Sequence, residues 1–201
     1  MTDDPDTLPA DLVALVGSRL CHDLISPLSA ISNGVELLGL SGAGMSPEIA
    51  LIAESVAAAN AKLKFFRVAF GNASKGQMIA AREINALLNE LSSSGRLKLA
   101  FAPQADQPRD MVKLAYLAIL CIETALPWGG KVTIEESETG WLVRAEADRT
   151  KPDSALWAAL NGTEVALRPA QVQFALLPRE AAAHGRKLSW GLSDGGAWIA
   201  F

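Results

Sequence analysis

Residues that can carry chemistry are scarce in this sequence of 201 residues. It has two cysteines, Cys21 and Cys121, and two histidines, His22 and His184. Their spacing is that of neither a zinc site nor a disulfide framework, so we expect no metal centre. Acidic residues (22) outnumber lysine and arginine (18), which gives a net charge of −4. Proteins that bind nucleic acid normally carry a basic face, so we expect no nucleic-acid partner.

Signals for export and for membrane insertion are also missing. A signal peptide starts with positive charge and continues into an apolar run, whereas the first fifteen residues contain four aspartates and no lysine or arginine. No uninterrupted apolar run approaches the ~18–20 residues that span a bilayer. We therefore expect a cytoplasmic protein with reduced thiols and no membrane association. The hydrophobic share of 50% is sufficient for a buried core and excludes a disordered chain.

Residues 1–75 are predicted to form a helical hairpin. Leu8 to Gly39 is helical in pattern, with an apolar seam in steps of three and four residues. Three glycines within residues 39–44 break this helix, and Ser46 and Pro47 suit the start of a second helix, which stops near Gly71. The seam residues are Cys21, Leu24, Leu28, Ile31, Val35 and Leu38 in the first helix, and Ile49, Ile52, Val56, Ala59, Leu63, Phe66 and Phe70 in the second.

Two long helices with a short connection pack as an antiparallel pair. One such hairpin leaves apolar residues beside its seams, namely Ile25, Leu37, Leu51 and Phe65. A homodimer in which two hairpins form a four-helix bundle would bury them, and we expect this dimer. Packing of the hairpin against the rest of the chain is the alternative.

His22 is the candidate nucleophile of the hairpin. It lies one residue beyond the seam residue Cys21 and shares a polar flank with Arg19, Ser26 and Ser29. The Asp23 carboxylate can accept a hydrogen bond from one ring nitrogen of His22, which leaves the other nitrogen unprotonated and able to attack. Pro27 removes a backbone hydrogen bond at this point and is expected to bend the helix beside the histidine. A surface histidine without a role is the alternative interpretation.

The run HDLISPL, from His22 to Leu28, resembles the H-box of histidine kinase dimerisation domains, which reads His-acid-Leu-x-x-Pro-Leu. With AISNG at residues 30–34 and FFRVAFG at residues 65–71, the sequence is similar to the ChpT-type family of bacterial histidine phosphotransferases. The resemblance implies that His22 is phosphorylated and that Asp23 orients and activates its ring. Ser26 occupies the position where many bifunctional kinases carry the Thr or Asn that supports dephosphorylation, so phosphatase activity is not implied.

Residues 76–201 are predicted to form an α/β sandwich with a mainly antiparallel sheet, which places the whole chain in the α+β class. Helices are expected at Ala81–Ser94, Arg109–Leu126 and about Ala170–Ala183. Strands are expected at Leu97–Ala102, Lys131–Glu136, Trp141–Ala147, near Lys187–Gly191 and at Ala197–Phe201. This order resembles the catalytic ATP-binding domain of histidine kinases.

Three nucleotide-binding motifs of that domain are altered here. Cys121 stands six residues before the proline of the Pro127-Trp128-Gly129-Gly130 turn, where kinases carry the asparagine that holds magnesium. Asp148 is followed by Arg-Thr-Lys-Pro instead of the glycines of Asp-x-Gly-x-Gly. The segment Arg168-Pro169-Ala170-Gln171 replaces a glycine-rich lid whose backbone N–H groups bind phosphates. We therefore expect neither ATP nor a metal of its own as cofactor.

The expected function is histidine phosphotransfer in a two-component phosphorelay. As the resemblance implies, His22 is expected to accept a phosphoryl group from a receiver-domain aspartate of a hybrid histidine kinase and to pass it to response regulators of the CtrA type. The partner receiver is expected to supply Mg²⁺. Arg19 is the candidate phosphoryl contact, and Ser26, Ser29 and Asn33 form the candidate docking surface. The alternatives are a divergent ATP-dependent histidine kinase and a non-catalytic dimeric scaffold. His184 is expected only to cap the last helix.

Overall fold

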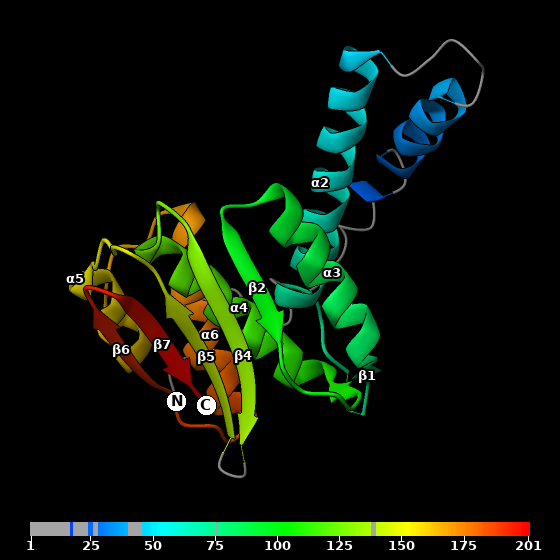
Figure 1. Cartoon of the computed structure of the whole chain (residues 1–201). Coiled ribbons are helices and arrows are strands. Elements are labelled where there is room, and N and C mark those ends of the chain that lie inside the picture. Colours follow the sequence, from blue (N-terminus) through cyan, green and yellow to red (C-terminus); the bar gives the residue numbers. More distant parts are fainter. Residues whose placement is uncertain (1–16, 18–23, 26–27, 40–45, 75, 138–139) are drawn as a thin grey trace. The chain divides into compact units, whose positions relative to one another are not determined.

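The computed structural model describes residues 17, 24–25, 28–39, 46–74, 76–137 and 140–201. The chain divides into two compact units, residues 1–73 and residues 74–201. The first unit is helical, and the second combines helices with a sheet (Figure 1). The predicted α+β class is therefore confirmed.

Two helices make up the described part of the first unit. Residues 28–39 are helical, and the second helix, α2, spans Pro47–Ala69. Ser46 caps α2, because its hydroxyl accepts a hydrogen bond from the Ile49 N–H at 3.4 Å, and Pro47 occupies the first turn as predicted. At the other end, the Phe70 N–H donates to the Phe66 carbonyl at 2.8 Å.

Gly17 packs against the end of α2. A Cβ atom placed on Gly17 would lie 3.1 Å from the carbonyl oxygen of Phe70 and 3.3 Å from its Cβ. Glycine thus permits a close approach that a side chain would hinder. Because Gly17 lies near the beginning of the hairpin and Phe70 at its end, the two helices run in opposite directions, as predicted.

The seam predicted for α2 is only partly correct. Val56 and Leu63 are buried, but Ile52 is 48% exposed and Ala59 is exposed as well. Asn60, which the prediction left off the seam, is half-buried. Among the described residues of this unit, the large apolar side chains that stay exposed are Leu24, Ile31, Leu37, Leu38, Leu51 and Ile52.

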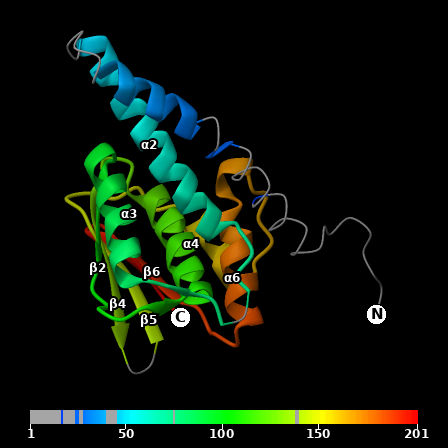
Figure 2. The same ribbon diagram turned by 90° about the vertical axis from the view of Figure 1, so that its right-hand side faces the viewer.

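The second unit is a five-stranded sheet with helices on one face (Figure 2). Its strands are β2 (Leu97–Phe101), β4 (Gly130–Ser137), β5 (Gly140–Glu146), β6 (Ser189–Ser193) and β7 (Gly196–Ala200). They lie in the order β2-β4-β5-β7-β6, and all neighbouring pairs are antiparallel except the parallel pair of β2 and β4. The covering helices are α3 (Ala81–Ser94), α4 (Arg109–Ala125) and α6 (Gln173–Ala183).

The core of this unit lies between α4 and the sheet. Residues 111–119 of α4 are all buried, and inward side chains alternate along the strands, as with Val132 and Ile134 on β4 and Val143 and Ala145 on β5. The period of two in these strands and the long apolar run in α4 are the patterns from which the sandwich was predicted.

Several short elements were not predicted. They are the paired strands β1 (Met78–Ile79) and β3 (Gln107–Pro108), the helix α5 (Ser154–Trp157), and the 3₁₀ turns η1 (Ala158–Asn161) and η2 (Pro169–Gln171). The last helix begins at Gln173 instead of about Ala170, because η2 occupies the residues in between. Elements of two to four residues are too short to show a hydrophobic period.

Candidate functional site

The predicted phosphoacceptor group is only partly covered by the structure. Arg19, His22, Asp23 and Ser26 lie outside the described residues. Of the predicted docking residues, Ser29 and Asn33 are both exposed on the helix at residues 28–39. They are four residues apart, so they lie on one flank of that helix.

Charge is segregated along the described part of the hairpin. The glutamates Glu36, Glu48 and Glu54 lie in the half next to the connection between the two helices. The cations Lys62, Lys64 and Arg67 lie in the second half of α2, which we call the basic half. Phe70, directly after the basic half of α2, contacts Gly17.

Cys121, at the magnesium-ligand position of kinases, is completely buried in α4. Burial raises the pKa of its thiol well above the usual range, since desolvation disfavours the thiolate. A thiol must lose its proton to bind a metal or to act as a nucleophile. Cys121 is therefore an apolar core residue, as the sequence indicated.

The Pro127–Gly130 turn and the segment after Asp148, which stand at altered nucleotide-binding motifs, contact each other. The guanidinium of Arg149 lies 3.8 Å from the ring centroid of Trp128. Two residues later, the Lys151 N–H donates to the Ala125 carbonyl at the end of α4, at 2.8 Å. Gly129 adopts a φ of +94° in the turn, and a Cβ there would lie 2.6 Å from the Arg96 carbonyl oxygen. Glycine is thus required at this position for the chain path itself.

The segment that replaces the kinase lid is fixed by glutamine side chains. The Gln171 amide oxygen accepts the Arg168 N–H at 3.0 Å. Gln173 is 5% exposed, and its amide N–H group donates to the Leu120 carbonyl of α4 at 3.4 Å and to the Ala170 carbonyl at 3.2 Å. These bonds use donors and acceptors that a phosphate-binding lid would leave open.

One ion pair and one histidine–carboxylate contact join α4 to the end of α6. Lys113 Nζ lies 2.6 Å from Glu180 Oε1, and their side chains are 6% and 19% exposed. His184 caps α6 as predicted, and its Nδ1 lies 3.2 Å from Asp110 Oδ2. The Lys113–Glu180 pair was not predicted, because its two residues are far apart in the sequence and Lys113 lies within an apolar run.

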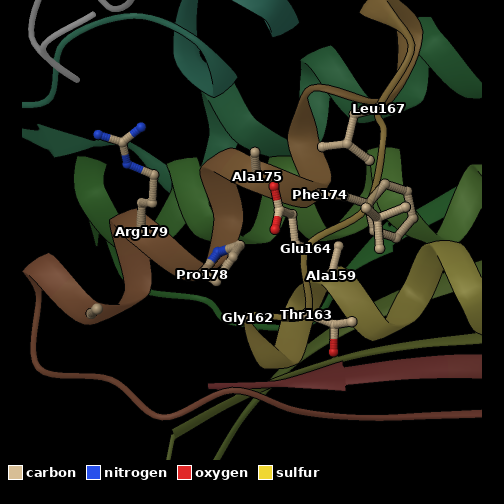
Figure 3. A pocket seen from close by; sticks show the side chains of 11 residues that line it. Ala159, Gly162, Thr163, Glu164, Leu167, Phe174, Ala175, Pro178 and Arg179 are labelled. Atoms are coloured by element: carbon tan, nitrogen blue, oxygen red, sulfur yellow. The ribbon is translucent and has the colours of Figure 1, made fainter. Parts of the chain in front are cut away.

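A hollow of about 450 Å³ lies between α6 and the segment after η1 (Figure 3). Most of its lining side chains are small or apolar, including Ala159, Leu167 and Phe174. The charged residues of the lining are Glu164 and Arg179. One carboxylate and one guanidinium do not make the cradle of backbone N–H groups that nucleotide phosphates require.

The described residues contain no group of three or more His, Cys, Asp or Glu side chains placed to bind a metal ion. Nor does any helix among them have the length and apolar character needed to cross a membrane.

Comparison with known proteins decides the family. The family model for the histidine phosphotransferase C-terminal domain matches residues 81–196, more than half of the chain. The chain belongs to this histidine phosphotransferase family. It is 39% identical over 140 residues to the protein phosphotransferase ChpT of Brucella abortus (strain 2308), a match that takes in 67% of this chain and 66% of that relative.

A likeness in fold to a solved phosphotransferase extends over nearly the whole chain. A bacterial phosphotransferase of known structure matches 98% of it and 99% of its own length, with 28% identity and a TM-score of 0.67. A histidine kinase from Burkholderia phymatum STM815 is less similar, with 20% identity and a TM-score of 0.41 over 96% of this chain and 94% of its own.

Proposed function

We propose that this family member is a phosphorelay intermediate. It accepts a phosphoryl group on His22 from one receiver domain and passes it to another. Its membership of the histidine phosphotransferase family carries the proposal. The H-box run from His22 to Leu28, and the exposed Ser29 and Asn33 that follow it, support His22 as the acceptor. The donor is proposed to be the receiver of a hybrid histidine kinase, and the acceptors response regulators of the CtrA type, all in the cytoplasm.

The proposed reaction needs only groups that the two partners bring together. The unprotonated ring nitrogen of His22 donates its electron pair to phosphorus. The bond between phosphorus and the aspartyl oxygen of the receiver breaks, and the receiver carboxylate leaves with that pair. The proton on the other ring nitrogen stays in place, held by Asp23. Mg²⁺ bound to the receiver neutralises phosphoryl charge during the transfer.

ATP is not proposed as a phosphoryl source for this chain. The buried Cys121 replaces the metal-binding asparagine, and Gln171 and Gln173 fix the segment in place of the lid. Glycines that would let a backbone approach phosphates are missing after Asp148.

The hairpin is proposed to form a four-helix bundle in a homodimer. Leu24, Ile31 and Leu38 of the first helix and Ile52 of α2 are each about half exposed within a single chain. They are all seam residues, and a second hairpin would remove them from water, at roughly 25 cal/mol for each Å² of apolar surface.

Sedimentation should give a mass twice that of the 21.2 kDa chain. The double variant Leu24→Glu with Ile52→Glu should sediment as a monomer, because a bundle core would then contain unpaired charge. As a control, Lys187→Glu, which adds an acidic charge at an exposed position of the second unit, should leave the dimer intact. A wild-type mass of 21.2 kDa at micromolar concentration would contradict the dimer.

Transfer of labelled phosphate tests the proposed function directly. The full chain is incubated with a donor receiver labelled on its aspartate, or with labelled ATP and Mg²⁺ alone. We expect label on the chain only from the receiver, and we expect it to be lost in acid and kept in base, as is typical of a phosphohistidine. Label from ATP would instead identify a kinase, and no label from either source would leave a scaffold.

A further inference from the structure

The hollow beside α6 has a floor that is fixed by aromatic packing. Phe174, one of its lining residues, is 0% exposed, and its ring centroid lies 5.8 Å from that of the fully buried Trp157. The volume of about 450 Å³ falls within the range of small-molecule sites in proteins, roughly 300–1,000 Å³. The hollow is therefore large enough for a small molecule and is already formed in the free chain.

Two local features of the sequence build this hollow. Gly162 ends η1 with a φ of +81°, which glycine adopts without strain, and the segment that follows lines the hollow together with α6. On the helix, residues 175, 178, 179 and 182 line it, and their spacing of three and four residues places them on one face. Ala175, Pro178 and Ala182 are short, so they leave space that larger side chains would fill.

Pro178 provides a hydrogen-bond acceptor on this face. Proline has no N–H, so it cannot donate to the carbonyl of Phe174, four residues before it in α6, and its ring crowds that carbonyl. Both residues line the hollow. The Phe174 carbonyl oxygen therefore lies beside the hollow without the donor that a regular helix would supply.

Two opposite charges flank the hollow without pairing. Glu164 and Arg179 both line it and are exposed, and neither forms an ion pair with any residue that the structure describes. Figure 3 shows them on different elements, Glu164 on the segment after Gly162 and Arg179 on α6, with their charged groups extending in different directions. A carboxylate and a carbonyl oxygen accept hydrogen bonds from an ammonium group, whereas a guanidinium donates to a carboxylate.

We propose that this hollow binds an apolar α-amino acid in its zwitterionic form. The ammonium group donates to the Glu164 carboxylate and the Phe174 carbonyl, the carboxylate accepts from Arg179, and the side chain packs on Phe174 and Leu167. Each part of such a ligand thus meets a group of matching chemistry. A side chain inserted by a partner protein would use the apolar floor alone, because it has neither an α-ammonium nor an α-carboxylate group.

The first test titrates L-leucine into the full-length protein by calorimetry, with three analogues that each lack one part of it. Isopentylamine lacks the carboxylate, 4-methylpentanoate lacks the ammonium group, and glycine lacks the apolar side chain. Each analogue should bind about tenfold or more weakly than leucine, since each leaves one group of the site without its partner. No binding of leucine at millimolar concentration would overturn the inference, and so would an analogue that binds as tightly as leucine.

The second test places the ligand in the hollow. Glu164→Gln and Arg179→Gln remove one charge at nearly constant size, and each should weaken leucine binding about tenfold. Ala175→Trp fills the space and should abolish binding. Arg186→Gln removes an exposed cation that does not line the hollow and should stay within twofold of wild type.

Circular dichroism shows that each variant is folded before it is titrated. Leucine binding that persists in a folded Ala175→Trp would overturn the inference, because the ligand would then bind elsewhere. Equal weakening in Arg179→Gln and Arg186→Gln would overturn it too, since net charge would then be responsible. All these variants retain His22, so the outcome is independent of phosphotransfer.

Discussion

Replacing His22 with alanine is expected to reduce phosphotransfer from a receiver by at least about a thousandfold, the scale on which loss of a nucleophile acts in enzymes. Alanine has no electron pair to offer to phosphorus, and neither the proposed docking surface nor a partner's Mg²⁺ can replace it. The described cysteine, Cys121, is not a substitute, because it is fully buried and its pKa is raised. Label transfer followed by gel separation measures the loss.

His184→Ala is the matched control for this experiment. It removes the other histidine, whose Nδ1 lies 3.2 Å from Asp110 Oδ2 at the end of α6. Transfer should remain within twofold of wild type, and the unfolding free energy should fall by about 1 kcal/mol at most, since the pair is partly exposed. Label that persists in His22→Ala and disappears in His184→Ala would contradict the assignment of the acceptor.

The second unit follows closely from its sequence where the elements are long. The 14 residues predicted for α3 form that helix with the same ends, because Ile84 and Leu88 repeat at helical spacing and are buried. β4 and β5 alternate inward and outward residues, and the alternation itself marked them as strands. The boundary of α6 was misplaced because Pro169 starts a separate 3₁₀ turn, which local sequence does not distinguish from the first turn of a helix.

The face of α2 was harder to predict, for a physical reason. This helix is apolar on more than one side, so two overlapping stripes fit steps of three and four residues, one through Ile52 and Ala59 and the other through Ala53 and Asn60. Hydrophobicity favours the first stripe, in which Ile52 and Ala59 are exposed, whereas the Gly17–Phe70 contact and the partial burial of Ala53 and Asn60 favour the second.

Glu180→Ala is expected to lower the unfolding free energy of the second unit by about 3 kcal/mol, because it leaves a buried ammonium without its partner. Lys113 Nζ lies 2.6 Å from Glu180 Oε1, and the lysine side chain is 6% exposed, so water cannot replace the lost carboxylate. Lys113→Met should cost less, since Glu180 is 19% exposed and can be partly hydrated. All five tryptophans lie in residues 74–201, so their fluorescence during urea unfolding reports on this unit.

Two further variants show whether charge burial is the cause. The double variant Lys113→Met with Glu180→Leu should be within about 1 kcal/mol of wild type, because removing both charges removes the desolvation cost together with the attraction. Glu123→Ala breaks the Arg96–Glu123 ion pair. A guanidinium nitrogen of Arg96 lies 3.2 Å from Glu123 Oε1, but the two side chains are 60% and 38% exposed. Its effect should be within about 0.5 kcal/mol, since exposed pairs are screened by water. If Glu180→Ala were no more harmful than Glu123→Ala, burial of an unpaired Lys113 ammonium would not carry the expected cost.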